Sequence, residues 1–228
     1  LDMAWDINSI SNNKEGLDNH LKSWLTREFG KEDASKLKAV MNEYYRLAYI
    51  RKPEFMGGTR TEESDPKYKI ISDLTWSEIE IKQRINDYNQ ISDAVAKIEK
   101  QISSHKKDSW FQLIEYPVLA SAQMNFKHLY GQLARHRLAT WQQSDAAFDS
   151  IISLTDRYNR ICNGKWNGMM NDHPRNLAVF GKVPRLEANE PLTKHETPLY
   201  VFNGCDYSAF TGTKPLAHGL ATKVLPSA

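Results

Sequence analysis

Two short stretches of this 228-residue chain gather aromatic, cationic and polar side chains densely enough to form a binding surface. The first, YYRLAYIRKPEF (44–55), places Arg51, Lys52 and Glu54 together after a run of aromatic residues. These three side chains would suit a protein partner or an anionic sugar. However, cations at a helix C-terminus and aromatic residues at helical spacing are also explained by the helix dipole and by core packing. We therefore favour the structural interpretation of this stretch.

The second stretch, NGKWNGMM (163–170), places large apolar side chains between flexible glycines. Gly164 is expected to end a helix, and the side chains that follow are Trp166, Asn167, Met169 and Met170. Tryptophan can stack on sugar rings, but tryptophan and methionine more commonly fill the end of a helical core. Together with Arg51, Lys52 and Glu54, these four residues are our candidates for a substrate rim or a domain interface.

The rest of the sequence contains no recognisable catalytic or cofactor motif, and we assign neither a catalytic residue nor a cofactor. His128 and His136 are eight positions apart, which is too far for two ligands of one metal on one helix, so no metal site is predicted. Two sets of charged residues are interpreted as solvated helix faces: Asp145, Asp149 and Asp156; and Lys127, Arg135 and Arg137.

The composition is that of an ordinary globular protein. The chain is 40% hydrophobic and 25% charged, and 30 basic residues against 28 acidic ones leave a net charge of +2. This balance argues against a nucleic-acid partner, and no apolar run is long enough to span a membrane. Cys162 and Cys205 could form one disulfide or remain two unpaired, buried thiols. Because the chain begins LDMAWDINS, we expect it to be an excerpt of a longer protein.

Hydrophobic periodicity predicts a mainly α fold, with about five long antiparallel helices in a bundle over residues 1–173. The predicted helices span about 13–29, 32–50, 75–105 and 108–142, with a fifth from after Ser144 to Asn163-Gly164. A Thr75–Glu78 capping box should begin the third, and Asp108 should cap the fourth, which Pro117 should kink. The predicted packing seam of the third helix consists of Tyr88, Ile91, Val95, Ile98 and Ile102.

Residues 174–228 differ in composition from the bundle. Prolines become frequent, helical periodicity disappears, and the runs LYVFN (199–203) and ATKVL (221–225) resemble strands. We expect an irregular segment there, consisting of a linker and a partial β-rich domain. Residues 53–74 form a second long connection, broken by Gly57, Gly58 and Pro66.

Four separated motifs resemble the helical domain of glycoside hydrolase family 115, the xylan α-glucuronidases. They are MAWD (3–6), YYRLAYIRKPEF (44–55), LIEYPV (113–118) and NGKWNGMM (163–170), and they occur in the family's order over roughly residues 3–175. The chain departs from the family pattern at Gly168, where members usually have histidine, and over residues 171–185.

The resemblance implies an accessory domain rather than a catalytic one. Members carry a catalytic barrel before this bundle, which provides the catalytic carboxylates, and a β-sandwich after it. DYSAF (206–210) and HGLATKVLP (218–226) look like the start of that sandwich. The implied partners are the catalytic barrel of the same parent protein, a second copy in a homodimer, and glucuronoxylan. The implied reaction of the parent is removal of glucuronic acid or its 4-O-methyl form from xylan, and the implied location is secreted or periplasmic.

Two other functions stay open from the residues alone. The chain could be a stand-alone carbohydrate-binding or protein-interaction module, or a small helical enzyme with an unrecognised site. Exposure of Trp166 is the feature that separates a sugar-binding module from a docking domain.

Overall fold

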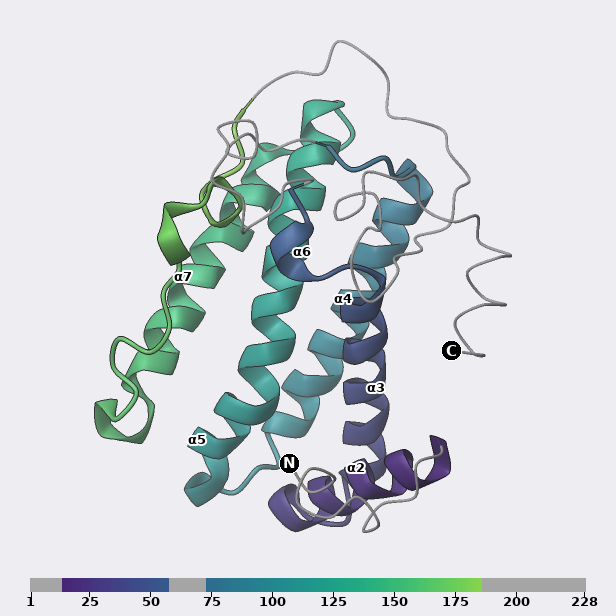
Figure 1. The fold of residues 1–228 in the computed structure, drawn as a ribbon, viewed down its shortest axis with the longest axis vertical. Coiled ribbons are helices and arrows are strands. Elements are labelled where there is room, and N and C mark those ends of the chain that lie inside the picture. The colour runs from purple at the N-terminus through teal and green to yellow at the C-terminus, as the bar shows by residue number, and fades with distance from the viewer. Residues whose placement is uncertain (1–13, 58–72, 186–228) are drawn as a thin grey trace.

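The computed structural model describes residues 14–57 and 73–185 (Figure 1). Its helices are α2 (Lys14–Phe29), α3 (Ala34–Ile50), α4 (Glu78–Glu99), α5 (Lys107–Trp110), α6 (Tyr116–Arg135) and α7 (Trp141–Gly164). Short 3₁₀ turns are η1 (Pro53–Phe55), η3 (Ser104–Lys106), η5 (Pro174–Asn176) and η6 (Ala178–Phe180), and η4 (Phe111–Glu115) is a π-helix. The predicted mainly α fold is confirmed, and no strand occurs within these ranges. The strand-like runs after residue 185, Cys205, MAWD and most of residues 53–74 lie outside the described residues.

Four long helices stand side by side and alternate in direction along the chain (Figure 1). α3 contacts α4, α4 contacts α6, and α6 contacts α7, while α2 packs against α3 at one end of the bundle. The predicted seam of the third helix is buried, because its five residues are each at most 8% exposed. Tyr88, Ile91, Val95 and Ile98 lie in α4, whereas Ile102 follows it, since the helix ends at Glu99 rather than near residue 105. This antiparallel arrangement therefore follows from apolar stripes on each helix.

The first two helices lie close to their predicted positions. Gly30 ends α2 with φ +102°, a conformation that favours glycine, and its N–H donates to the carbonyl of Thr26 at 3.0 Å. Leu25 is fully buried, whereas Leu17, two turns earlier on α2, is 47% exposed. α3 ends at Ile50, before Pro53, as predicted.

α4 begins two residues later than its predicted cap implies. Ser77, not Thr75, is the N-cap: its hydroxyl accepts from the Glu80 N–H at 3.3 Å, and its own N–H donates to Glu80 Oε2 at 2.7 Å. Trp76 is 8% exposed and joins the core, whereas Thr75 faces solvent. The buried tryptophan therefore fixes where the chain enters the helix, and the second Ser/Thr-x-x-Glu pattern forms the box.

Ser77→Ala should lower the free energy of unfolding by about 0.5–2 kcal/mol, because the Glu80 N–H loses its acceptor. Thr75→Ala removes the hydroxyl that was predicted to cap the helix, and it should change the free energy of unfolding by less than about 0.5 kcal/mol. Urea denaturation followed by circular dichroism measures both. Equal losses in the two variants would contradict the assignment of the cap to Ser77.

The predicted fourth helix is divided into α5, η4 and α6. The π-helix over Phe111–Glu115 lies immediately before Pro117, which occupies the first turn of α6. A proline is tolerated there because its missing N–H has no essential partner in a first turn. Asp108 does not cap this helix; its carboxylate accepts from the Cys162 N–H at 2.9 Å instead. α6 ends at Arg135 rather than Gln142, since Arg137 adopts φ +62°.

α7 begins at Trp141, earlier than predicted, with Thr140 as its N-cap. The Gln143 side chain accepts from the Thr140 N–H at 3.2 Å. At its other end the backbone leaves helical geometry: Ile161 has ψ 159°, and Cys162 and Asn163 have φ of 52° and 54°. Cys162 is consequently rotated off the core face, so its predicted burial is wrong and its thiol is exposed.

Candidate functional site

The candidate residues after α3 do not share one environment. Arg51 is only 2% exposed, and its Nε and Nη2 donate to the carbonyl of Phe55 at 2.9 and 2.5 Å. Its predicted role on a surface rim is therefore wrong, because the guanidinium is used to hold the η1 turn against the end of α3. Lys52 is exposed and Glu54 is half-buried.

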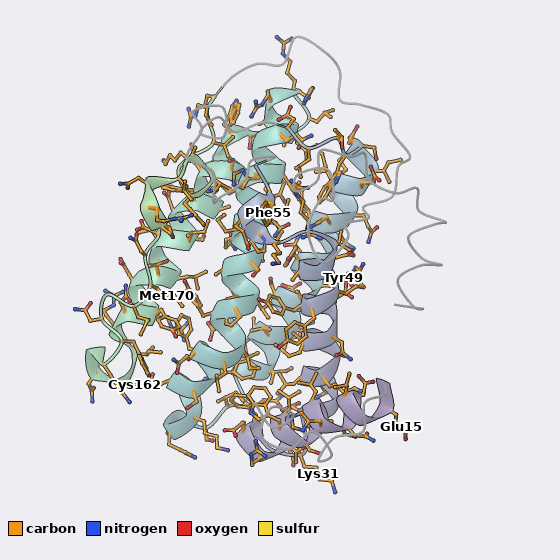
Figure 2. All side chains as sticks on the ribbon, viewed as in Figure 1. Glu15, Lys31, Tyr49, Phe55, Cys162 and Met170 are labelled. Carbon is orange, nitrogen blue, oxygen red and sulfur yellow. The ribbon has the colours of Figure 1, made fainter. Side chains whose placement is uncertain are left out.

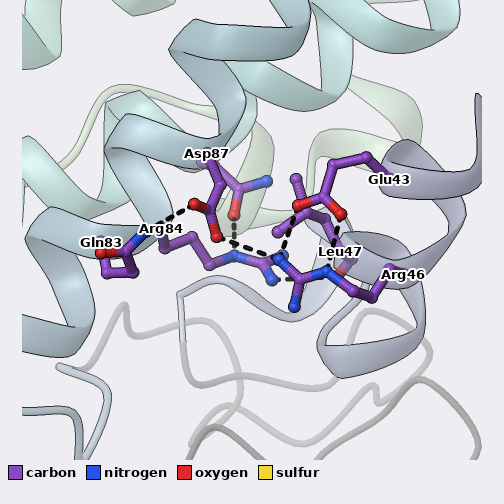
Figure 3. A network of polar contacts seen from close by, with 7 residues as sticks. Glu43, Arg46, Leu47, Gln83, Arg84 and Asp87 are labelled. Atoms are coloured by element: carbon purple, nitrogen blue, oxygen red, sulfur yellow. Dashed lines mark hydrogen bonds and ion pairs between the residues drawn. The ribbon is translucent and has the colours of Figure 1, made fainter. Parts of the chain in front are cut away.

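A second buried arginine, Arg84 of α4, was not anticipated as a functional or structural centre. It is 1% exposed. Its Nη1 donates to the Leu47 carbonyl at 2.9 Å (Figure 3). Its Nε donates to Asn125 Oδ1 at 2.8 Å, and its Nη2 donates to the Arg51 carbonyl at 2.8 Å. Arg84 thus joins α4 to α6 and places a cation at the C-terminal end of α3, which the helix dipole favours.

Burial lowers the pKa of Arg84 to about 10, so the side chain stays protonated at neutral pH. The guanidinium lies 5.5 Å from the Trp76 ring centre and 5.2 Å from that of Tyr88. The burial of Arg84 could be predicted from the sequence, because Arg84 lies on the same helical face as Ile81, Ile85 and Tyr88. The sequence analysis left Arg84 unassigned, because charged residues are seldom fully buried unless they are paired.

Beside Arg84, a surface network links α3 to α4. Arg46 donates to Glu43 at 2.6 and 2.8 Å and to Asp87 at 3.0 Å, and Gln83 donates to Asp87 at 2.7 Å (Figure 3). Arg46 is about half exposed, and exposed ion pairs contribute little free energy. This network therefore orients side chains on the surface without anchoring the fold.

The outer face of α3 carries two exposed aromatic side chains. Tyr45 is 54% exposed and Tyr49 is 42% exposed, and their spacing of four residues places them on one helical face. Figure 2 shows Tyr49 on the outer side of the bundle, away from α7. Large exposed tyrosines are enriched where proteins contact partners, so this face is a candidate docking surface.

A cleft of about 350 Å³ lies between η1, α6 and the chain after α7. Its lining residues are Pro53, Glu54, Met124, Pro174, Arg175, Leu177 and Phe180. The walls are largely apolar, with the Glu54 carboxylate and the Arg175 guanidinium as the charged groups. The cleft joins one predicted candidate, Glu54, to the chain segment that follows α7.

The NGKWNGMM stretch packs mainly as the predicted plug. Trp166 and Met170 lie against a cluster formed by Phe111, Tyr158 and Ile161. Asn159 of α7 holds the turn, since its amide donates to the Met170 carbonyl at 2.9 Å and its oxygen accepts from the Met170 N–H at 3.0 Å.

The polar and exposed residues of this stretch face outward. Asn167 is exposed and Met169 is 59% exposed, while the Lys165 ammonium lies 4.9 Å from the Trp166 ring centre. Trp166 itself is only partly exposed, and the cation beside its ring limits its use as a platform for sugars.

The two candidate stretches do not form one site. Phe55 lies in the upper part of the bundle as drawn, whereas Met170 and Cys162 lie along the outer side and lower end of α7 (Figure 2). Glu54 shares its cleft with residues 174–180, and Trp166 belongs to the separate Phe111 cluster. A single rim made from all seven predicted residues is therefore not formed within the bundle.

Lys127 corrects the prediction of a solvated basic face on α6. It is fully buried, and its ammonium donates to the carbonyls of Val179 and Gly181 at 2.7 and 2.8 Å. Burial lowers its pKa to about 7. His128 is also buried, and its Nε2 lies 2.9 Å from the Val179 carbonyl, to which it donates as the Nε2–H tautomer.

The other charged residues that were predicted to face solvent are either exposed or form ion pairs near the surface. Asp149 and Asp156 are exposed, and Asp145 pairs with Lys182 and Arg185. His136 pairs with Asp73 at 3.0 Å. Across residues 14–57 and 73–185, no three His, Cys, Asp or Glu side chains converge closely enough to hold a metal ion. Every helix in the same ranges is too short or too polar to cross a bilayer.

Comparison with known proteins assigns this geometry to a family. The sequence profile of glycosyl hydrolase family 115 matches residues 1–55, which include α2, α3 and η1. A solved structure of a family GH115 4-O-methyl-α-glucuronidase, BtGH115A, with specificity for decorated arabinogalactans, is similar to 86% of this chain, with 48% sequence identity and a TM-score of 0.81. The chain carries the helical domain of family 115.

Most of this chain matches a small part of the BtGH115A chain. This chain spans 26% of the BtGH115A chain, so the family 115 bundle corresponds to one part of a much larger enzyme. No curated protein sequence matches the chain. The profile match contains Tyr45, Tyr49 and Arg51 and ends at Phe55, so the aromatic face of α3 belongs to the segment that carries the family signature.

Proposed function

We propose that this family 115 bundle is an accessory domain that docks against the catalytic barrel of the same parent protein and supplies no catalytic residue. The observation that carries the proposal is the 48% identity to a glucuronidase of which the chain spans 26%. Glycoside hydrolysis generally needs two carboxylates across the glycosidic bond. Among the described residues, Glu115 instead pairs with Arg157, and Asp145 pairs with Lys182 and Arg185.

For the parent, we propose hydrolysis that removes glucuronic acid or its 4-O-methyl form from polysaccharide side chains. The family resemblance favours glucuronoxylan as the polysaccharide. The specificity of BtGH115A for decorated arabinogalactans supports a second polysaccharide with the same terminal sugar. Both polysaccharides belong in any activity assay, since the sugar removed is shared and the backbone differs.

The docking surface we propose is the outer face of α3, made by Tyr45 and Tyr49, with exposed Lys52 beside it. Tyrosine contributes a large rigid apolar area and a polar tip, which suits an interface that excludes water. Glu54 extends this surface toward the cleft. Asn167 and Met169, at the far end of α7, remain candidates for a second contact, and a second copy of the chain is the alternative occupant of either face.

The stand-alone carbohydrate-binding module is the second candidate. Its best feature is the exposed methionine and half-buried tryptophan of residues 163–170. Calorimetric titration of the chain with 4-O-methylglucuronic-acid-substituted xylo-oligosaccharides should give no measurable heat of binding if the docking proposal is right. Binding in the micromolar range that Trp166→Ala abolishes and Trp110→Phe preserves would support the module instead.

The docking proposal itself is tested in a chimera. BtGH115A with its own bundle replaced by this chain should release 4-O-methylglucuronic acid from decorated arabinogalactan, whereas deletion of the bundle should abolish release. Tyr45→Ala combined with Tyr49→Ala should lower the activity or stability of the chimera. The matched control is Leu17→Ala, which truncates a similarly exposed side chain on α2 and should change neither.

A further inference from the structure

We propose that residues 177–183 form a pH-sensitive strap, tied to the bundle by Lys127 and held more firmly as the solution becomes more alkaline. The strap contains the 3₁₀ turn η6 and connects α7 with the chain that follows Arg185. It also supplies Leu177 and Phe180 to the wall of the Glu54 cleft. The inference is independent of the proposed docking function.

The strap is packed into the bundle. Val179 is 1% exposed and Val183 is 6% exposed, and both join a small apolar cluster with Met124 of α6 and Ile151 of α7. Gly131 of α6 makes room for it, since a Cβ at that position would lie 2.8 Å from Val183 Cγ1. Close contact of this kind fixes the strap in one position.

The polar tie lies beneath this apolar layer. Lys127 donates to two strap carbonyls, those of Val179 and Gly181, and His128 donates to the first of them. Ser144 of α7 donates to the Lys127 carbonyl at 2.7 Å, which holds this turn of α6 against α7. Within the described residues no carboxylate pairs with the Lys127 ammonium, so neutral oxygens and the Phe148 ring, 5.8 Å away, are what face it.

A buried ammonium without an acid partner makes docking of the strap depend on pH. In the docked state burial lowers the pKa of Lys127 to about 7 from its ordinary 10.5. Release of the strap removes the two carbonyls that cover the ammonium, and its pKa then returns toward the ordinary value. The released state therefore binds more protons than the docked state between these two values.

Docking of the strap therefore strengthens as pH rises. Below about pH 7 the lysine is protonated in both states, and docking does not change with pH. Between pH 7 and pH 10.5 docking requires loss of a proton that the released state retains, so docking strengthens as pH rises. The neutral amine still carries N–H groups to donate, so the hydrogen bonds survive deprotonation. The docking constant should rise about tenfold from pH 6 to pH 8.

Other titratable groups lie near the Lys127 ammonium, and their effect on docking must be distinguished from that of Lys127. Burial, reinforced by Lys127, lowers the pKa of His128 well below its usual range, so that His128 stays neutral over this interval. His173 packs edge-on against Phe148, 5.7 Å between ring centres. Among the described residues, the charged groups near this region include Arg51, Glu54, Arg135, Asp145, Arg175, Lys182 and Arg185.

Hydrogen exchange of the full 228-residue chain tests the strap. The amides of Phe180 and Gly181, which donate within η6, report on docking. Their protection factors, corrected for intrinsic exchange and referred to an α4 core amide, should rise about tenfold from pH 6 to pH 8. The rise should persist in His173→Gln and disappear in Lys127→Met, a neutral variant of similar length. A flat profile in the unmodified chain, or an unchanged rise in Lys127→Met, would overturn the proposal.

Direct titration of Lys127 in the unmodified chain tests the proposal without relying on Lys127→Met. The ¹³Cε resonance of Lys127, followed by NMR in the unmodified chain, should titrate with an apparent pKa near 7. Titration near the ordinary value for lysine would overturn the proposal even if Lys127→Met failed to fold.

Discussion

Replacing Arg84 with methionine is expected to lower the free energy of unfolding by about 3 kcal/mol, because three buried acceptors lose a charged donor. Those acceptors are Asn125 Oδ1 and the carbonyls of Leu47 and Arg51. Methionine keeps most of the apolar stem but also removes the guanidinium that lies beside the Trp76 and Tyr88 rings. Removing the charge also removes its desolvation cost, which offsets part of the loss. The net loss should stay large because the acceptors remain buried.

Two companion variants make the Arg84 result specific. Arg84→Lys retains the charge but reaches fewer acceptors with a single ammonium, so it should lose less than Arg84→Met. Arg46→Ala removes an exposed arginine of the neighbouring network and should cost less than about 1 kcal/mol. Urea denaturation monitored by circular dichroism measures all three. If Arg84→Met and Arg46→Ala lowered the free energy of unfolding equally, the hydrogen bonds of Arg84 would not be what holds α3, α4 and α6 together.

Trp110→Ala is expected to destabilise the bundle by about 3–5 kcal/mol, the range for truncating a buried aromatic side chain. Trp110 is fully buried and meets Phe29 edge to face at 5.4 Å between ring centres. It therefore joins α5 to the end of α2. Loss of this contact should release α2 before the other helices, as read by hydrogen exchange of α2 amides.

The matched variant for Trp110 is phenylalanine. The indole Nε1 is buried and has no hydrogen-bond partner among the described residues, so its removal should carry little polar cost. Trp110→Phe should therefore lose roughly 1–2 kcal/mol, chiefly from the smaller ring. Both free energies of unfolding come from the same urea titration. Equal losses for alanine and phenylalanine would show that packing volume is not what Trp110 contributes.

Apolar periodicity was sufficient for the framework of the fold. The α4 seam from Tyr88 to Ile98 was predicted because its steps of three and four residues bring every member to one face. Helix ends were less predictable, since both Thr75 and Ser77 begin a Ser/Thr-x-x-Glu pattern. Burial of Trp76, a tertiary fact, selects the second of them.

Charged residues account for most of the errors in the candidate site. Arg51, Arg84 and Lys127 were each expected to face water or were left unassigned, and all three are buried with backbone carbonyls as acceptors. A single sequence does not display the partners of Arg84 and Lys127, because they lie far along the chain; Arg51 bonds to the nearby Phe55 carbonyl, and only the turn at η1 brings that carbonyl to it. Arg84 could have been found from its position on an apolar helical face; Lys127 depends on a strap more than fifty residues later.

The chimera in which this chain replaces the bundle of BtGH115A tests the central claim most directly. The measured quantity is release of 4-O-methylglucuronic acid from decorated arabinogalactan and from glucuronoxylan, by the chimera, by the enzyme lacking any bundle, and by this chain alone. The account predicts turnover by the chimera and none by the other two. Turnover by this chain alone, or full activity of the enzyme without a bundle, would contradict it.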